Sequence, residues 1–290
     1  MRRLFGVALA LVATIAVAAE IAPEARRSGY GFASAETRVT QDDDTANPGM
    51  LWVSQGEGLW TKKAGAAGLS CRDCHGDAQA SMSNVAARYP AFDAALGRPI
   101  DLEQRINLCR TEHQRAEPLT WESEDLLALT GFVAHQSRGL PIAVDDNPEL
   151  RPFSALGDEL FHRREGQLNL SCSQCHDDNW DKRLAGSVIP QGHPTGYPVY
   201  RLEWQSVGSL QRRLRNCMTG VRAEPYEYGA PDAVALELYL MERARGMTIR
   251  NPGGAPLIKR GPVLFVRVVV LIGEGRDDGA ELGDRVMLDL

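Results

Sequence analysis

The sequence predicts a mostly α-helical protein that arose as a tandem duplication. A C-x-x-C-H pentapeptide occurs twice, at Cys71–His75 and at Cys172–His176. The residues around both pentapeptides match in register, and each copy closes with a helical pattern, over Asp125–Gly139 and Asp232–Gly246. The composition, 43% hydrophobic and 24% charged, is typical of a globular chain and not of a disordered or fibrous one.

Length and charge limit the classes of function. The chain of 290 residues is long enough for roughly two domains. Its formal net charge of −6 argues against nucleic-acid binding through net positive charge, so no nucleic-acid partner is expected. After residue 19, no apolar stretch reaches the ~20 residues of a transmembrane helix, so no membrane span is expected.

The first 19 residues read as a signal peptide. Arg2 and Arg3 give a positive start, an uncharged apolar stretch follows, and small residues close it at Ala16–Ala19. The alternative, an N-terminal membrane anchor, would need a longer apolar stretch. The mature protein is therefore expected to be soluble and located in the periplasm.

The duplication sets the expected domain boundaries. Residues 20–145 are expected to form an N-terminal arm and a first domain, 146–250 a second domain, and 251–290 an atypical tail. The first 30 or so mature residues have few periodic apolar positions, so they are expected to run as an extended arm. Closing helices are expected over 122–137 and 230–245, and a linker rich in turn residues over 139–152. The apolar run 263–272 has strand character, and nothing in the sequence gives it a function.

Each C-x-x-C-H motif predicts a covalently bound haem c. One helical turn presents two thiols to the haem vinyl groups, and the adjacent histidine becomes the proximal iron ligand. The alternatives are a disulfide within each motif and a zinc site shared by four cysteines, but neither explains the histidine that follows both times. The expected ligands are the thioether cysteines and proximal histidines Cys71, Cys74, His75, Cys172, Cys175 and His176.

The distal iron ligand should recur in both copies. No methionine or histidine does so, but Cys109 and Cys217 stand at matching positions, each three residues after an apolar residue on one helical stripe. We therefore expect His75 with Cys109 and His176 with Cys217 as axial pairs, with thiolate on the iron. The structural alternative is a disulfide between Cys109 and Cys217.

A basic patch distinguishes the second copy. No acidic residue lies between Gln211 and Ala223, whereas acidic and basic residues alternate around Cys109. The arginines of this patch are Arg212, Arg213, Arg215 and Arg222. Such a patch beside a sulfur nucleophile should concentrate a small anion. Arg213, one turn before Cys217, could bind an oxyanion through its planar guanidinium. The alternative is that these arginines pair with haem propionates or with acids elsewhere. The second copy is the candidate active site.

These residues resemble the SoxA family, the dihaem subunits of SoxAX cytochrome complexes in sulfur oxidation. The resemblance covers residues 28–250 and is most specific over Arg213–Thr219 and Arg222–Tyr226. It implies two class I cytochrome c-like domains and an L-cysteine S-thiosulfotransferase that joins thiosulfate oxidatively to a cysteine of the sulfur-carrier protein SoxYZ. It further implies that Cys217, as a persulfide, is both distal ligand and catalytic residue, and that Arg213 holds the anion.

The same resemblance implies a partner. A small SoxX-like cytochrome c would form a heterodimer with the chain, and electrons would pass to a downstream cytochrome. A dihaem electron carrier without substrate chemistry is the main alternative function. A dihaem peroxidase and a non-enzymatic scaffold for a partner cytochrome are further alternatives.

Overall fold

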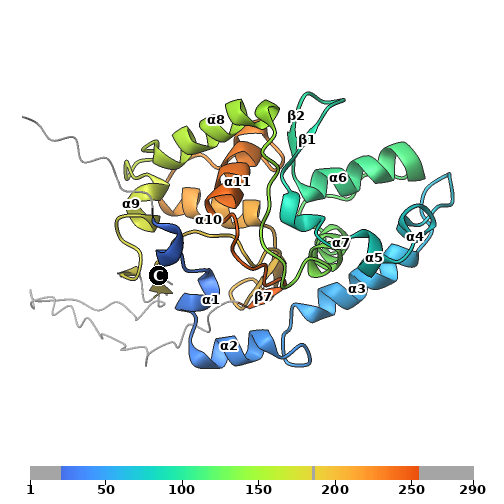
Figure 1. Ribbon diagram of the computed structural model, residues 1–290, viewed down its shortest axis with the longest axis horizontal. Coiled ribbons are helices and arrows are strands. Elements are labelled where there is room, and N and C mark those ends of the chain that lie inside the picture. Colours follow the sequence, from blue (N-terminus) through green and yellow to red (C-terminus); the bar gives the residue numbers. More distant parts are fainter. Residues whose placement is uncertain (1–20, 185–186, 255–290) are drawn as a thin grey trace, which may run out of the picture. The chain divides into compact units, whose positions relative to one another are not determined.

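The fold repeats one series of elements twice along the chain. The computed structural model describes residues 21–184 and 187–254. The mostly helical class and the tandem duplication that the sequence predicted are confirmed. The series in each copy comprises an opening helix, a motif helix, a hairpin, a cysteine-bearing helix and a closing helix (Figure 1). In the first copy these are α3 (Met50–Thr61), α4 (Cys71–His75), β1 (Ala91–Asp93) with β2 (Arg98–Ile100), α6 (Leu102–Cys109) and α7 (Glu124–His135). In the second they are α8 (Arg151–His162), α9 (Cys172–His176), β5 (Val199–Arg201) with β6 (Ser206–Gly208), α10 (Leu210–Gly220) and α11 (Pro231–Arg243).

Shorter elements connect this repeated series. The 3-10 turns are η1 (Pro23–Ala25), η2 (Ala86–Arg88) and η4 (Pro148–Leu150), and a π-helical turn, η3 (Arg110–Gln114), extends α6. The remaining short helices are α1 (Gly29–Phe32), α2 (Ala35–Asp42) and α5 (Ala78–Ser81). The remaining strands are β3 (Arg183–Leu184), β4 (Ser187–Val188) and β7 (Gly253–Gly254).

The opening and closing helices of each copy cross at a glycine. A Cβ atom on Gly56 of α3 would lie 2.1 Å from the carbonyl oxygen of Ala128 in α7. A Cβ atom on Gly157 of α8 would lie 2.2 Å from the carbonyl oxygen of Ala235 in α11. Only glycine permits so close an approach, and this approach fixes the helix pair that supports each motif helix.

The two copies share a hydrophobic core, and backbone hydrogen bonds join the linker to the end of the second copy. One buried cluster joins residues of the first copy and the linker to residues of the second, namely Ala87, Ile142, Val144, Leu150, Leu238, Ala244 and Ile249. The linker also pairs with the end of the second copy, since Gly139 N donates to Ile249 O at 2.9 Å and Ile142 N donates to Met247 O at 2.9 Å. The linker therefore lies against both copies.

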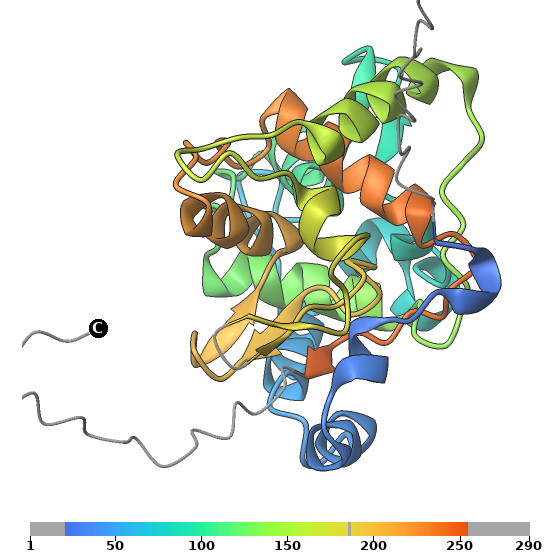
Figure 2. The same cartoon turned by 90° about the vertical axis from the view of Figure 1, so that its left-hand side faces the viewer.

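The expectation of an extended N-terminal arm is wrong, because α1 and α2 are helical. Ser34 caps α2 by accepting a hydrogen bond from Thr37 N at 3.2 Å, which stabilises a short polar helix without apolar periodicity. Buried Gln41 of α2 donates to Arg250 O at 3.3 Å, next to β7, and Figure 2 shows α2 (blue) beside β7 (red-orange). Capping and a tertiary contact, which hydrophobic periodicity does not register, thus order the arm.

The closing helices match their predicted ranges to within two residues at each end. Of the atypical tail, the structure places β7, which pairs in parallel with β5; the apolar run 263–272 lies outside the described residues, as does the signal segment 1–19. Within the described ranges, no helix is long and apolar enough to cross a membrane.

Candidate functional site

The two motif helices begin with the same capping box. Ser70 Oγ accepts from Asp73 N at 3.1 Å while Asp73 Oδ2 accepts from Ser70 N at 2.8 Å. In the second copy Ser171 Oγ accepts from Gln174 N at 3.3 Å while Gln174 Oε1 accepts from Ser171 N at 2.9 Å. These reciprocal bonds hold a helix of only five residues, so that both thiols and the imidazole project from a fixed turn.

The imidazole of His176 is oriented by its surroundings. Its Nδ1 donates to the carbonyl oxygen of Pro190 at 2.6 Å, and Gly192 lies against the ring. A histidine that ligates a metal commonly donates its other ring N–H to a carbonyl in this way, which leaves Nε2 for the metal. His75 is more exposed and lies 5.8 Å, between ring centroids, from Trp60.

The structure brings each helix cysteine to the C-x-x-C pair of its own copy. Burial raises the pKa of Cys172 to about 12, and the charge of Cys217 adds to the rise. Burial and the charge of Cys109 likewise raise the pKa of Cys71. All six cysteines are free, so the structure contains neither a disulfide within a motif nor one between Cys109 and Cys217. Among the described residues, no group of three or more His, Cys, Asp or Glu side chains is arranged to hold a metal ion.

Cys217 and Cys109 differ in their electrostatics. Burial raises the pKa of the Cys217 thiol, but His176 and the charge of Arg213 lower it by more, to about 7. At Cys109 burial again raises the pKa, and the charge of Glu112 adds to the rise. The charge of Arg105 lowers the pKa, but by less. The thiolate form is therefore favoured near neutral pH in the second copy and disfavoured in the first.

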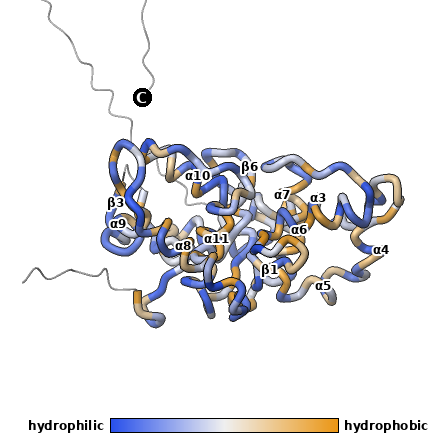
Figure 3. The backbone as a smooth tube through the Cα atoms, turned by 90° about the horizontal axis from the view of Figure 1, so that it is seen from above, coloured by the Kyte–Doolittle hydropathy of each residue, from blue (hydrophilic) through white to orange (hydrophobic). Residues whose placement is uncertain are grey.

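The basic patch around Cys217 is smaller than the sequence indicates. Arg212 lies 3.6 Å from Glu122 of the first copy and 4.5 Å over the ring of Trp204, and Arg215 donates to the carbonyl oxygen of Tyr226. The expectation of a wholly uncompensated patch is thus wrong, because tertiary contacts supply partners that lie outside the segment. Arg213 differs: its guanidinium forms no salt bridge with an acid of the described residues, although the charge of Glu203 acts on it, and its own charge acts on Cys217. Figure 3 shows the hydrophilic residues along α10.

Two residues that the sequence analysis missed also lie at this site. Arg201, at the end of β5, lowers the pKa of Cys217 through its charge, and Tyr197 faces the charges of both Arg213 and Arg201. Neither residue belongs to a short motif. Alignment of the two Tyr-Pro pairs, at residues 89–90 and 197–198, could have found both, because these pairs precede equivalent hairpins.

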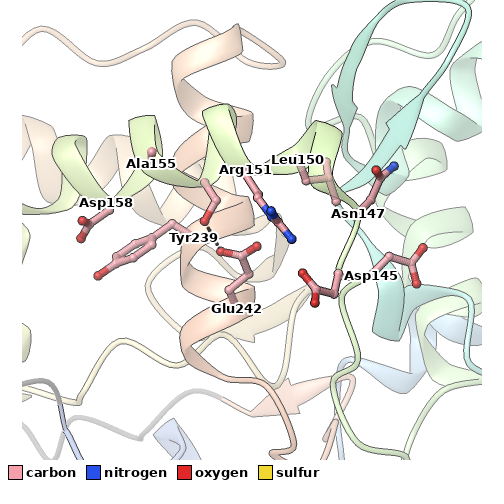
Figure 4. Close-up of a pocket in the computed structure, with 10 residues that line it drawn as sticks. Asp145, Asn147, Leu150, Arg151, Ala155, Asp158, Tyr239 and Glu242 are labelled. Atoms are coloured by element: carbon pink, nitrogen blue, oxygen red, sulfur yellow. Dashed lines mark hydrogen bonds between the residues drawn. The ribbon is translucent and has the colours of Figure 1, made fainter.

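A surface cavity of about 400 Å³ between α8 and α11 is a poor site for an anion. Its labelled lining includes Asp145, Asp158 and Glu242 but only one basic residue, Arg151 (Figure 4). Ser154 donates to Glu242 within it. Acidic groups repel anions, so this cavity does not suit an anionic substrate.

The side chains of each copy suit a covalent haem c. A one-turn helix presents two free thiols, an imidazole follows them, and a third thiol faces the pair from the α6 or α10 helix. In the second copy the Pro190 carbonyl holds the imidazole in the tautomer that a ligand requires. The two copies thus provide two haem c sites.

Comparisons with known proteins agree with this arrangement. A family model described as SoxA/TsdA, cytochrome c domain, matches residues 55–142 and 156–249. The L-cysteine S-thiosulfotransferase subunit SoxA of Pseudaminobacter salicylatoxidans is 41% identical over 226 residues, which span 78% of this chain and 79% of the relative. That of Rhodovulum sulfidophilum is 33% identical over 226 residues, with the same coverage. The crystal structure of SoxXA from P. pantotrophus matches with a TM-score of 0.76 and 31% identity, covering 79% of this chain and 87% of that chain.

Proposed function

The chain belongs to the SoxA/TsdA cytochrome c family, and from that premise we propose that it is the dihaem subunit of an L-cysteine S-thiosulfotransferase with its active site at Cys217. The substrates are thiosulfate and the thiol of a SoxYZ-type sulfur-carrier protein. A SoxX-like small cytochrome c is the heterodimer partner, a name that the similar SoxXA structure suggests. Residues 1–19 direct the chain to the periplasm, and a downstream cytochrome takes the electrons.

The observation that carries this proposal is the contrast between the two equivalent cysteines. Of the two, only Cys217 combines a thiol pKa lowered to about 7 with a neighbouring arginine that forms no salt bridge with an acid of the described residues. A pure electron-transfer site needs neither feature. A sulfur-transfer site needs both, because the thiolate is the nucleophile and the substrate is an anion.

The reaction divides into two balanced half-steps. In the first, the Cys217 thiolate forms an S–S bond to the sulfane sulfur of thiosulfate, and two electrons leave. In the second, the carrier thiolate attacks that sulfur and releases the Cys217 thiolate, so that the carrier ends as a thiosulfonate. The same balance holds when Cys217 carries one extra sulfur as a persulfide. A haem held by Cys172, Cys175, His176 and Cys217 would supply one-electron acceptor chemistry.

The residues of the chain position these groups. Arg213 holds the oxyanion of thiosulfate close to the Cys217 sulfur and offsets the repulsion between thiolate and anion. Pro190 fixes the imidazole of His176 through the 2.6 Å hydrogen bond. Cys71, Cys74 and His75, with Cys109, hold the first haem, whose role is not substrate chemistry.

The experiment replaces each cysteine in turn. Cys217→Ala should abolish thiosulfate-dependent reduction of the cytochrome acceptor while both haems stay covalently attached, as measured by steady-state kinetics and the mass of the intact chain. Cys109→Ala, the matched change in the first copy, should retain turnover. Mass spectrometry of the wild-type peptide should show one additional sulfur on Cys217 in a fraction of the molecules. Full turnover in Cys217→Ala would overturn the role of Cys217, whereas a wild type without any thiosulfate-dependent turnover would leave the dihaem electron carrier as the better function.

A further inference from the structure

The two hairpins that precede the cysteine helices are structurally equivalent. In β1 and β2, Ala91 pairs with Ile100 and Asp93 with Arg98, while in β5 and β6, Val199 pairs with Gly208 and Arg201 with Ser206. Each hairpin leads within two residues into its cysteine helix, since α6 begins at Leu102 and α10 at Leu210. Arg201 of the second copy therefore occupies the position of Asp93 in the first.

In the first copy this position neutralises the helix arginine. Asp93 Oδ2 accepts a hydrogen bond from Arg105 Nη2 at 2.6 Å, and the Tyr89 hydroxyl accepts one from Arg105 Nε at 3.2 Å. The side chain of Asp93 is only 10% exposed, so the ion pair is partly shielded from water. An anion near Cys109 would therefore meet an arginine whose charge is already paired.

In the second copy the same position adds a positive charge instead. Arg213 is the equivalent of Arg105, and the acid that would pair with it is replaced by Arg201. The Arg201 side chain is 18% exposed. Its Nη2 donates to Glu203 Oε1 at 3.4 Å, in a longer and more exposed ion pair than that of Arg105 with Asp93, and its guanidinium lies 5.3 Å over the ring of Trp204. Both arginines act on the same two groups, Cys217 and Tyr197. The charges of two half-buried guanidinium groups thus act on one thiol.

We propose that Arg201 is a second anion-binding residue of the Cys217 site and that, with Arg213, it selects a doubly charged oxyanion. This inference rests on the proposed function, whose substrate carries two negative charges. Each planar guanidinium donates parallel N–H groups that match the oxygens of an oxyanion. Two such groups favour thiosulfate or sulfite over a singly charged anion without oxygens, such as hydrosulfide. At equivalent positions the first copy carries the acid Asp93 and the second copy the base Arg201. This difference in charge makes the second copy, and not the first, a site for the substrate.

The test uses the holoprotein in complex with its partner cytochrome. Arg201→Ala should raise the KM for thiosulfate roughly ten- to a hundredfold with little change in kcat, as expected when one charge-assisted contact to a bound anion is lost. Arg201→Asp recreates the first-copy pair with Arg213 and should raise the KM further. Arg201→Lys keeps the charge and should restore part of the affinity. Arg164→Ala removes one exposed positive charge of the second copy as the matched control and should leave the KM unchanged.

A binding measurement separates this inference from the proposed function. Equilibrium dialysis of radiolabelled thiosulfate against the oxidised complex, without the sulfur carrier, should show weaker binding in Arg201→Ala and in Arg201→Asp. Haem content and the far-ultraviolet circular dichroism spectrum check that each variant is folded. Unchanged KM and binding in folded Arg201→Ala and Arg201→Asp, with an active wild type, would overturn the role of Arg201 alone. A wild type that binds thiosulfate but never turns it over would overturn the proposed function instead.

Discussion

At the scale of single residues, one sulfur atom acquires different chemistry from its neighbours. Cys109 and Cys217 stand at matching positions, yet the thiol pKa is raised at the first and lowered to about 7 at the second. Burial raises the pKa at both sites. At Cys109 the charge of Glu112 adds to the rise and Arg105 lowers the pKa by less, whereas at Cys217 the hydrogen bond of His176 and the charge of Arg213 outweigh burial. Charge arrangement, and not the cysteine itself, therefore distinguishes the two copies.

Replacement of Arg213 tests this distinction directly. Arg213→Ala removes the cation next to the Cys217 sulfur, so the KM for thiosulfate should rise roughly ten- to a hundredfold. The matched change in the first copy, Arg105→Ala, removes an arginine that is already paired with Asp93 and should leave the KM unchanged. Steady-state turnover with a cytochrome acceptor measures both. An equal rise in the two variants would point to long-range charge and not to a bound anion.

The sequence predicted some of these residues and could not have predicted others. Cys217 and Arg213 follow from covalent chemistry and from helical spacing, which are local properties of the chain. The partners of Arg212 and Arg215 do not, because Glu122 comes from the other copy and the carbonyl of Tyr226 from a later loop. Arg201 belongs to no short motif. Alignment of the two Tyr-Pro pairs could have pointed to it, but only the hairpin register shows that it occupies the position of Asp93.

At the scale of elements, each motif helix depends on a helix pair behind it. The α8 and α11 helices approach at Gly157, and the residues around this contact form a core of Leu160, Phe161, Leu236 and Leu240 that includes Cys172 at its edge. The helical periodicity of the apolar residues in the sequence predicted the range of α11. It did not predict α2, whose stability comes from the Ser34 cap and from the contact of Gln41 with the Arg250 carbonyl.

Substitution at the helix crossing should destabilise the second copy. Gly157→Ala would place a methyl group 2.2 Å from the Ala235 carbonyl oxygen, so the helices must separate. We expect a loss of about 1–3 kcal/mol in the free energy of unfolding, typical of overpacking. Gly131→Ala in α7 is the control, because its Cβ meets no atom within 4 Å and alanine favours the helix. Denaturant unfolding of the holoprotein measures both, and equal stabilities would show that the crossing can relax.

At the scale of the whole molecule, a buried polar cluster joins the two copies. Gln211 of α10 donates to Asp101 Oδ2 at 2.7 Å and to Glu237 Oε2 at 3.2 Å, and it accepts from Gly229 N at 2.8 Å. Asp101 caps α6 of the first copy, whereas Glu237 lies on α11 of the second. The repeat in the sequence predicted two similar copies. It could not predict this junction, because equivalent positions carry different residues, Asp101 in one copy and Ser209 in the other.

The junction should make the stability of the protein depend on pH. Burial raises the pKa of Asp101 to about 6 and that of Glu237 to about 8, and burial together with both of these neighbours also raises the pKa of Glu103. The charge of Arg98 opposes the rise at Asp101, and Glu122 adds to the rise at Glu103. A carboxyl whose pKa is raised on folding binds its proton more tightly in the folded state. The stability from Glu237 is therefore complete below its ordinary value of 4.5 and is lost as the pH rises to about 8.

Glu237→Gln isolates this effect, because the amide oxygen can still accept the hydrogen bond of Gln211 but cannot ionise. The wild-type Tm should fall between about pH 6 and pH 8, the upper part of the window that the pKa values of Asp101 and Glu237 define. The Tm of the variant should fall less over this pH range, and near pH 8 it should be higher than that of the wild type. Thermal unfolding of the holoprotein across this range measures the difference, and titrating groups common to both proteins cancel in it. Parallel curves would mean that Glu237 is already ionised in the folded protein and that the junction between the copies tolerates its charge.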